Sequence, residues 1–236
     1  MVSGLADRIE GIPATWRRAL THRGEARVER VLDLWSAAVA EQMPRTIEYL
    51  CGHVRDVELT RYGNERSGYS HFLLYVLRNQ GGETFYVSGG NPLALRFEGT
   101  RLERDWPRVP ASIRRFYEEL HNGLGVTVEY PNAFPPVEVV EGLSEVPSFS
   151  FEGLEQPRRI NPDSSYAFFY HWPGDHVVVD LDNCANDQAT IWWESAKPSY
   201  GQSFWRQVDA WFVVEADPEY AELAGVRPPI LTAFTA

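Results

Sequence analysis

The spacing of apolar residues changes from helical to alternating near residue 54, and this change strongly constrains the fold. Between Glu25 and Gln42, apolar residues recur every three or four positions, which is typical of an amphipathic helix. Pro44 should break or restart this helix, and residues 46–53 can add further helical turns. From Val54 to Phe97 the apolar residues alternate instead, with turn-forming residues at 64–68, 79–82 and 89–92. We therefore expect a helix followed by an antiparallel meander of about four strands.

The meander should turn one apolar face toward a core, as antiparallel sheets commonly do. The residues expected on that alternating face are Val57, Leu59, Phe72, Leu74, Val76, Phe85, Val87, Leu93, Leu95 and Phe97.

A second helix is expected at Pro110–His121. It follows a charged stretch at Leu102–Val109, a seam between two parts of the chain. Proline suits the first helical position, and Gly123 suits a left-handed cap after the helix. Its apolar stripe is formed by Ile113, Phe116, Tyr117 and Leu120. His121 at the helix end would be favoured as a cation near the negative end of the helix dipole. The seam divides the chain into two expected units, residues 1–105 and 106–236, which can still form one continuous fold.

The second unit contains further strand patterns and a last helix. Strands are expected at 166–171, 176–181 and 189–194, with one more at 137–140 in a proline-rich stretch and a hairpin turn at 172–174. The last helix should span residues 202–215, with Phe204, Val208, Trp211 and Phe212 on one face. Trp192 and Trp193 are adjacent on a strand, so they must point to opposite faces, which allows one to be core and the other to reach the surface.

The order of these segments resembles the SUKH superfamily (the Smi/Knr-like proteins). The matching residues are Pro110, Phe116, Tyr117, Asn122 and Gly123, then Val178, Val179, Asp180, Leu181 and Asp182, then Ile191, Trp192 and Trp193, and finally Ser203, Phe204 and Val208. The resemblance covers about residues 109–214 and implies an α+β fold: antiparallel sheet or sheets with helices packed on one side. The N-terminal helix and β-meander would be an extension of that fold. It also implies a function, because bacterial members of the family are mostly immunity proteins that neutralise toxins.

Charge is uneven along the chain, whose net charge is −11. Residues 1–105 contain 14 basic and 14 acidic residues, whereas residues 106–236 contain 8 basic and 19 acidic ones. Such a second half repels nucleic acid and attracts a basic protein, although solubility alone also explains acidity. No apolar run reaches the ~20 residues of a membrane span, and charges interrupt any signal peptide, so we expect a cytoplasmic protein. Cys51 and Cys184 are expected to be reduced, buried thiols.

Sequence patterns for phosphate-binding loops, dinucleotide-binding turns, nucleophile elbows and zinc sites are missing, so we expect a non-catalytic protein without metal or cofactor. The acids at Asp175–Asp187 can form turns, bind a partner or, as a third hypothesis, serve a small hydrolase together with His176. The residues proposed for binding a toxin are Asp180, Asp182, Asp187, Glu194, Trp192 and Trp193, with Glu118 and Glu119 on the polar face of the 110–121 helix. The alternative function is a SUKH-type scaffold that binds a cellular partner.

Overall fold

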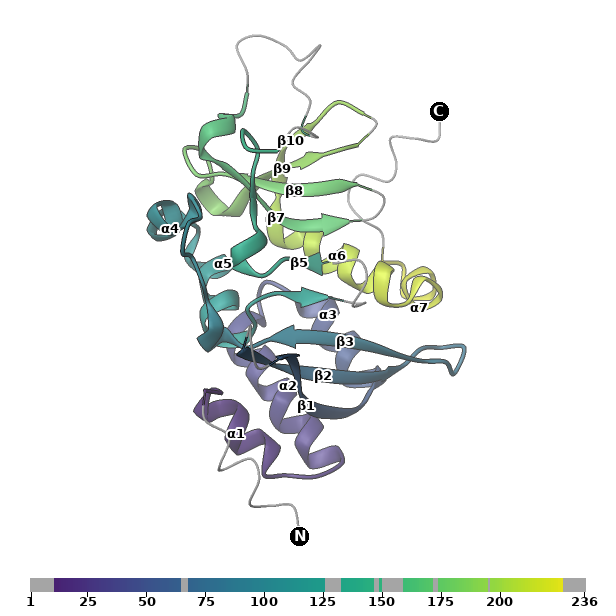
Figure 1. Cartoon of the computed structure of the whole chain (residues 1–236). Helices are drawn as coiled ribbons and strands as arrows, with labels where there is room; N and C mark the ends of the chain where they lie inside the picture. The colour runs from purple at the N-terminus through teal and green to yellow at the C-terminus, as the bar shows by residue number, and fades with distance from the viewer. Residues whose placement is uncertain are drawn as a thin grey trace.

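The alternating side chains build one antiparallel sheet, and the amphipathic helices cover one of its faces (Figure 1). The computed structural model describes residues 11–64, 68–125, 133–146, 149, 159–171, 174–194 and 196–226. The strands pair in the order β1-β2-β3-β4-β5-β7-β8-β9-β10, and β6 pairs with β7 off this path. The expected α+β fold with an antiparallel sheet is confirmed.

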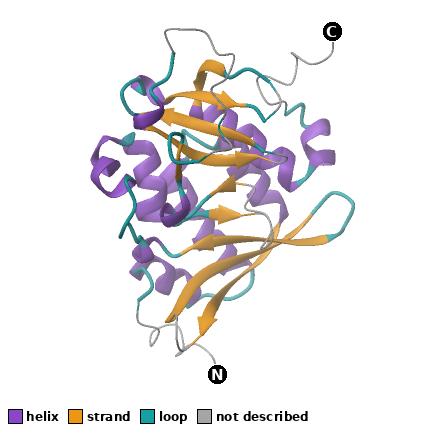
Figure 2. Cartoon of the chain, turned by 45° about the horizontal axis from the view of Figure 1, so that its top comes forward, coloured by secondary structure: helices purple, strands orange, loops and turns teal. Residues whose placement is uncertain are grey.

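The strands are β1 Val54–Asn64, β2 Gly68–Arg78, β3 Thr84–Gly90, β4 Leu124–Gly125, β5 Ala133–Phe134, β6 Glu141–Gly142, β7 Ser165–His171, β8 Asp175–Asp180, β9 Gln188–Trp192 and β10 Ser199–Ser203. The helices are α1 Ala14–Leu20, α2 Glu25–Val39, α3 Pro44–His53, α4 Leu102–Asp105, α5 Ala111–Arg115, α6 Phe204–Ala216 and α7 Pro218–Leu223. Shorter helical turns are η2 Pro92–Ala94, η3 Trp106–Arg108, η4 Phe116–Leu120, η5 Val137–Val139, η6 Pro162–Ser164 and η7 Ala185–Asp187. Figure 2 shows the longer helices behind the strands.

The sheet has two well-formed halves, β1–β3 and β7–β10, joined through the two-residue strands β4 and β5. One core runs under both halves. Phe116 lies at the join, where it stacks on Phe134 at 4.1 Å between ring centroids and meets the Trp35 ring edge-on at 6.4 Å. The described parts of the two expected units, 1–105 and 106–236, therefore share a sheet and a core.

The core of the second half agrees with the sequence pattern. The following residues of the expected helices and strands are all buried: Ile113, Phe116, Tyr117, Leu120, Val177, Val179, Leu181, Ile191, Phe204, Val208 and Phe212. Ser203 caps α6, because its hydroxyl accepts a hydrogen bond from the Arg206 N–H. Pro44 begins α3, as expected for a proline that restarts a helix.

The prediction of which face of β2 is buried was wrong by one residue. The structure buries Leu73, Tyr75 and Leu77, and it leaves Phe72, Leu74 and Val76 half-buried on the opposite face. This strand is apolar on both faces, so alternation alone cannot select the core side. The cross-strand row of Val57, Tyr75 and Val87 selects it.

Other segments also differ from the expectation. The meander has three strands, because Leu93–Phe97 leave the sheet at the turn η2, where Pro92 lacks a donor for a ladder. Residues 137–139 form the turn η5 instead of a strand, and the edge strand β10 was not anticipated. Cys51 is exposed rather than buried, and both cysteines are free thiols. Residues 172 and 173 of the expected hairpin turn lie outside the described residues.

Candidate functional site

Asp180 ends β8 and holds together the loops at this end of the strands in the sheet's second half. Its buried carboxylate accepts hydrogen bonds from the Ser164 hydroxyl at 2.6 Å and from the Asn161 N–H at 3.0 Å. The Asp182 N–H donates to the same carboxylate at 3.1 Å. Asn161–Ser164 reads N-P-D-S, a turn sequence whose first side chain bonds its own backbone. Asp180 therefore joins this turn to the loop after β8.

Asp182 extends the same junction toward the surface. Its carboxylate accepts from the Asn161 side-chain amide at 2.7 Å and lies 2.9 Å from the Ser164 hydroxyl, and it also pairs with the Arg108 guanidinium. The hydrogen bonds from Asn161, Ser164 and Arg108 hold the pKa of Asp182 below its usual range. Asp182 is thus an ionised, solvent-accessible carboxylate with partners from η3 and η6.

Asp187 fastens the following turn to the helix α5. Its carboxylate accepts from the Ser112 hydroxyl at 3.0 Å, and Ser112 in turn accepts from the Trp205 indole at 2.9 Å. Asp187 has a φ of 57°, a left-handed conformation that costs less for Asp and Asn than for most residues. Asp187 was expected to contact a partner, and in the structure its side chain stabilises this turn.

Trp192 ends β9 and Trp193 follows it, and the two side chains point to opposite faces, as expected for adjacent residues of an extended chain. Trp192 is 5% exposed and packs with Phe149 in a small second cluster on the face of the sheet away from the helices. Trp193 is half-buried on the helix side, where its ring meets Trp211 edge-on at 6.0 Å. Both indoles pack against the fold, and Trp193 keeps the larger exposed area.

The three glutamates of the proposed binding set are exposed, two of them on η4 and one in the loop after β9. Glu194 follows β9, and its backbone N–H donates to Asp175 at 2.9 Å. Glu118 and Glu119 lie on η4, where Glu118 accepts from the Trp106 indole at 2.8 Å. The structure therefore brings Asp180 and Asp182 into one hydrogen-bonded junction, while the glutamates stand apart from it as surface carboxylates.

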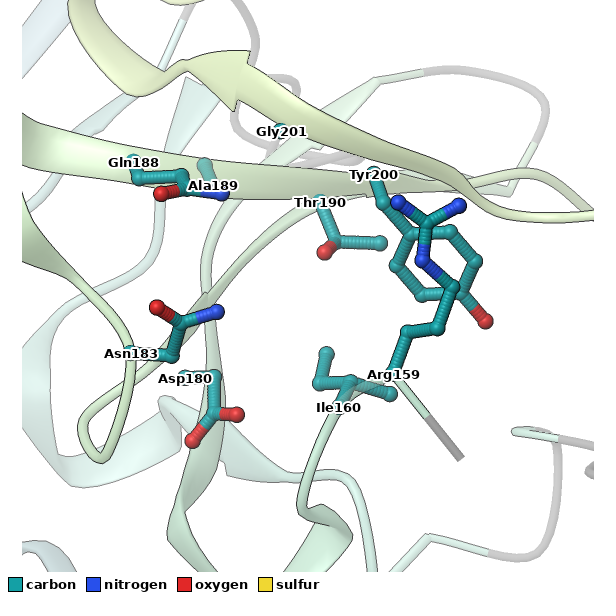
Figure 3. Close-up of a pocket in the computed structure, with 9 residues that line it drawn as sticks. All are labelled: Arg159, Ile160, Asp180, Asn183, Gln188, Ala189, Thr190, Tyr200 and Gly201. Carbon is teal, nitrogen blue, oxygen red and sulfur yellow. The ribbon is translucent and has the colours of Figure 1, made fainter. Parts of the chain in front are cut away.

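A small polar hollow adjoins this junction, with a volume of about 80 Å³ (Figure 3). Its lining residues are Arg159, Ile160, Asp180, Asn183, Gln188, Ala189, Thr190, Tyr200 and Gly201. The Arg159 guanidinium lies over the Tyr200 ring, 4.8 Å from its centroid. Sequence reasoning missed Arg159 and Tyr200. The available signal was the N-P-D-S turn, which indicates a loop corner next to Arg159.

His176, the base of the hydrolase hypothesis, does not share a hydrogen bond with the described acids. Its ring packs against Tyr170 and Phe149 on the face away from the helices, and burial lowers its pKa. Asp182 and Asp187 are bound to partners on other segments. The described residues thus give His176 no carboxylate partner within hydrogen-bond distance.

His171, in contrast, lies between two carboxylates. Its Nε2 is 2.8 Å from Glu215 and its Nδ1 is 3.9 Å from Asp175, while its ring stacks on Trp211 at 4.3 Å. Burial lowers the pKa of His171, but the carboxylates of Asp175 and Glu215 outweigh burial and raise it to about 9. A protonated His171 therefore ties the β7–β8 hairpin to α6.

His121, expected at a helix end as a cation, is instead a buried neutral ring. The Trp35 indole donates to the Tyr75 hydroxyl at 2.9 Å, and that hydroxyl lies 2.7 Å from His121 Nε2. Nε2 then accepts, which leaves the proton on Nδ1, 3.3 Å from the Gly90 carbonyl. Burial lowers the pKa of His121 to about 3. The expectation failed because the chain leaves the helix at His121 and turns its ring into the core.

Asn122 and Gly123, which carry part of the family resemblance, also have packing roles. The Asn122 side chain accepts from the Val137 N–H at 2.9 Å and donates to Glu138 at 3.1 Å. Gly123 has a φ of 83°, and a Cβ there would lie 2.7 Å from the Pro136 nitrogen. A residue with a side chain would therefore be both strained and crowded at this position.

In the part of the chain that the structure describes, no three His, Cys, Asp or Glu side chains are grouped closely enough to hold a metal ion. Within the same residues, no helix is both long and apolar enough to cross a membrane. Comparisons of the chain with protein-family models, with curated proteins and with solved structures found no match.

Proposed function

We propose that this protein is a non-catalytic, cytoplasmic immunity protein that binds a cognate bacterial toxin and blocks it. The observation that carries the proposal is the set of carboxylates on the surface of residues 106–236. Exposed members of the set are Glu118, Glu119, Glu138, Glu145, Asp163, Asp182, Glu194, Glu219 and Glu222. Such a surface attracts a basic protein and accelerates its encounter.

The rigidity of the acidic loops also supports a binding role. Asp180, Asp182 and Asp187 fix the loops through bonds to Ser164, Arg108 and Ser112. A preorganised loop loses little conformational freedom when a partner binds, which favours affinity. Asp182 remains accessible on this frame, whereas Glu194 is exposed at the other end of β8 and β9, beside Asp175. We therefore place the toxin at the Asp182 end of these strands.

Co-expression with each neighbouring toxin gene tests the function directly. We expect rescue of growth and a stable complex with one toxin. The lysine substitutions Asp182→Lys and Glu194→Lys should each slow association most at low salt, because exposed charges act mainly on encounter. Glu83→Lys and Glu98→Lys on the first half are matched controls that should leave the association rate unchanged. If no neighbouring toxin is neutralised or bound, the proposal fails.

A further inference from the structure

A groove on the first half of the molecule lies outside the acidic surface just described. It runs between α2 and the segment where α3 ends and β1 begins, and its volume is about 500 Å³. Its floor is apolar, because the lining includes Val28, Leu32 and Val54, which are all buried in the core. Figure 1 shows α2 beside β1 in the lower part of the view, away from β8–β10.

One rim of the groove is acidic along its whole length. Glu25, Glu29 and Asp33 follow each other at intervals of four residues on α2, so they lie on one side of the helix. All three are exposed and line the groove. Asp33 pairs with Arg30 at 2.9 Å, but both side chains are exposed, and such pairs are weak.

The opposite rim carries little charge to balance this stripe. Arg55 is the basic residue among those that line the groove, against three carboxylates. The groove therefore combines an apolar floor with a predominantly acidic edge. An occupant that matches both features has apolar residues on one side and basic residues beside them.

The dimensions favour a helix as the occupant. From Glu25 to Ser36, α2 lines the groove over a length of roughly 16 Å, which corresponds to about three helical turns. Helices commonly dock in such grooves through apolar residues at intervals of three and four. We propose that this groove is a second docking site, which binds a basic amphipathic helix of another protein.

Cys51 provides a built-in reporter of occupancy. It is an exposed, free thiol among the residues that line the groove. The other cysteine, Cys184, is half-buried on the second half of the molecule and can be replaced by alanine. In a Cys184→Ala background, the alkylation rate of Cys51 by iodoacetamide reports directly on whether the groove is covered.

The test uses a fluorescein-labelled helical peptide of about four turns, with leucines on one face and arginines beside them. We expect the peptide to bind the full-length protein in anisotropy titrations and to slow Cys51 alkylation at least about fivefold at saturation. The variant Glu25→Gln/Glu29→Gln/Asp33→Asn should weaken binding by about tenfold. The matched variant Glu83→Gln/Glu98→Gln/Glu103→Gln, which removes the same charge from exposed residues outside the groove, should change it by less than about twofold.

Several outcomes would overturn the proposal. These are no binding of the peptide, equal weakening by the two triple variants, or an unchanged Cys51 alkylation rate at saturating peptide. Sedimentation of the free protein as a dimer with a protected Cys51 would assign the groove to a second copy. Faster Cys51 alkylation after removal of residues 1–10 would assign it to the chain's own N-terminus. None of these readouts depends on toxin neutralisation, so the two proposals can fail separately.

Discussion

The two halves of the sheet share a helix-covered inner face but differ on their outer face. In β7–β10, the outer side chains Ala167, Val178 and Trp192 are buried against Leu143, Phe149 and Ile160. In β1–β3, the corresponding face carries Phe72, Leu74 and Val76, which are half-buried, and Tyr86, which is 52% exposed. The comparison shows that apolar alternation predicts where a strand is, whereas segments distant in sequence determine whether its second face is covered.

The halves also use their histidines in opposite ways. His121 lies under β2 and β3, where burial keeps it neutral and an uncharged hydrogen-bond chain from Trp35 and Tyr75 leads to its ring. His171 lies on β7, where Asp175 and Glu215 keep it protonated. Histidine is thus neutral at one position and protonated at the other because the surroundings differ.

The largest expected effect is at the join between the halves. Phe116 is fully buried and contacts aromatic rings from both sides, including Trp35 and Phe134. Phe116→Ala should lower the free energy of unfolding by about 3–5 kcal/mol, through lost burial and the resulting cavity. Urea unfolding measures this loss. Leu93→Ala, at a residue that is 63% exposed, is the matched control and should change stability by less than about 0.5 kcal/mol. A loss below about 1 kcal/mol for Phe116→Ala would show that the join is loosely packed.

A pair of substitutions on the outer faces compares the halves directly. Trp192→Ala should cost about 3–5 kcal/mol, because the indole is buried in the second cluster. Phe72→Ala should cost only about 1 kcal/mol, because its ring already contacts water. Urea unfolding of both variants gives the difference. Equal losses would mean that the outer face of β1–β3 is covered in solution, which would contradict the comparison.

The sequence predicted elements with one apolar face better than those with two. The stripe of Ile113, Phe116 and Leu120 predicted its helix and its buried side together. In β2, both faces are apolar, so the same reasoning selected Phe72 instead of Leu73. A periodic pattern predicts which side chains share a face of an element. It does not predict which of two apolar faces packs on the core.

The candidate site was less predictable for a related reason. Asp180 and Asp182 were identified as acids at a strand end, but their partners Asn161 and Ser164 lie on a separate turn before β7. Contacts of this kind depend on the order of the strands in the sheet, which cannot be predicted from local sequence. The same applies to His121, which is neutral because it is buried, and whose hydrogen-bond partner Tyr75 is 46 residues away in the chain.

The neutral histidine of the first half should make the protein sensitive to acid. A histidine whose folded pKa is depressed destabilises the fold once the unfolded chain begins to take up the proton, below about pH 6.5. The free energy of unfolding should therefore fall by up to about 1.4 kcal/mol per pH unit between pH 6.5 and 3, or about 2 kcal/mol at pH 5. NMR titration of the His121 ring tests the cause, since the ring should stay neutral in the folded protein at pH 5. Protonation of the folded ring near pH 6.5 would refute it.

The charged histidine of the second half should produce the smallest effect, with the opposite sign. A histidine whose folded pKa is raised stabilises the fold below its unfolded value of about 6.5, and this contribution disappears as pH rises toward 9. Because the side chain of His171 retains 19% of its exposure and Asp175 is 3.9 Å away, we expect a loss of only about 1–2 kcal/mol across this range. His171→Gln should remove the alkaline loss and lower stability at pH 6 by a similar amount. Glu215→Gln keeps a hydrogen-bonding side chain but removes its charge, so it should reduce the same slope in urea unfolding at pH 6, 7.5 and 9. If the native protein and both variants lose stability equally between pH 6 and 9, His171 is not a charged link between β7 and α6, and the contrast with His121 does not hold.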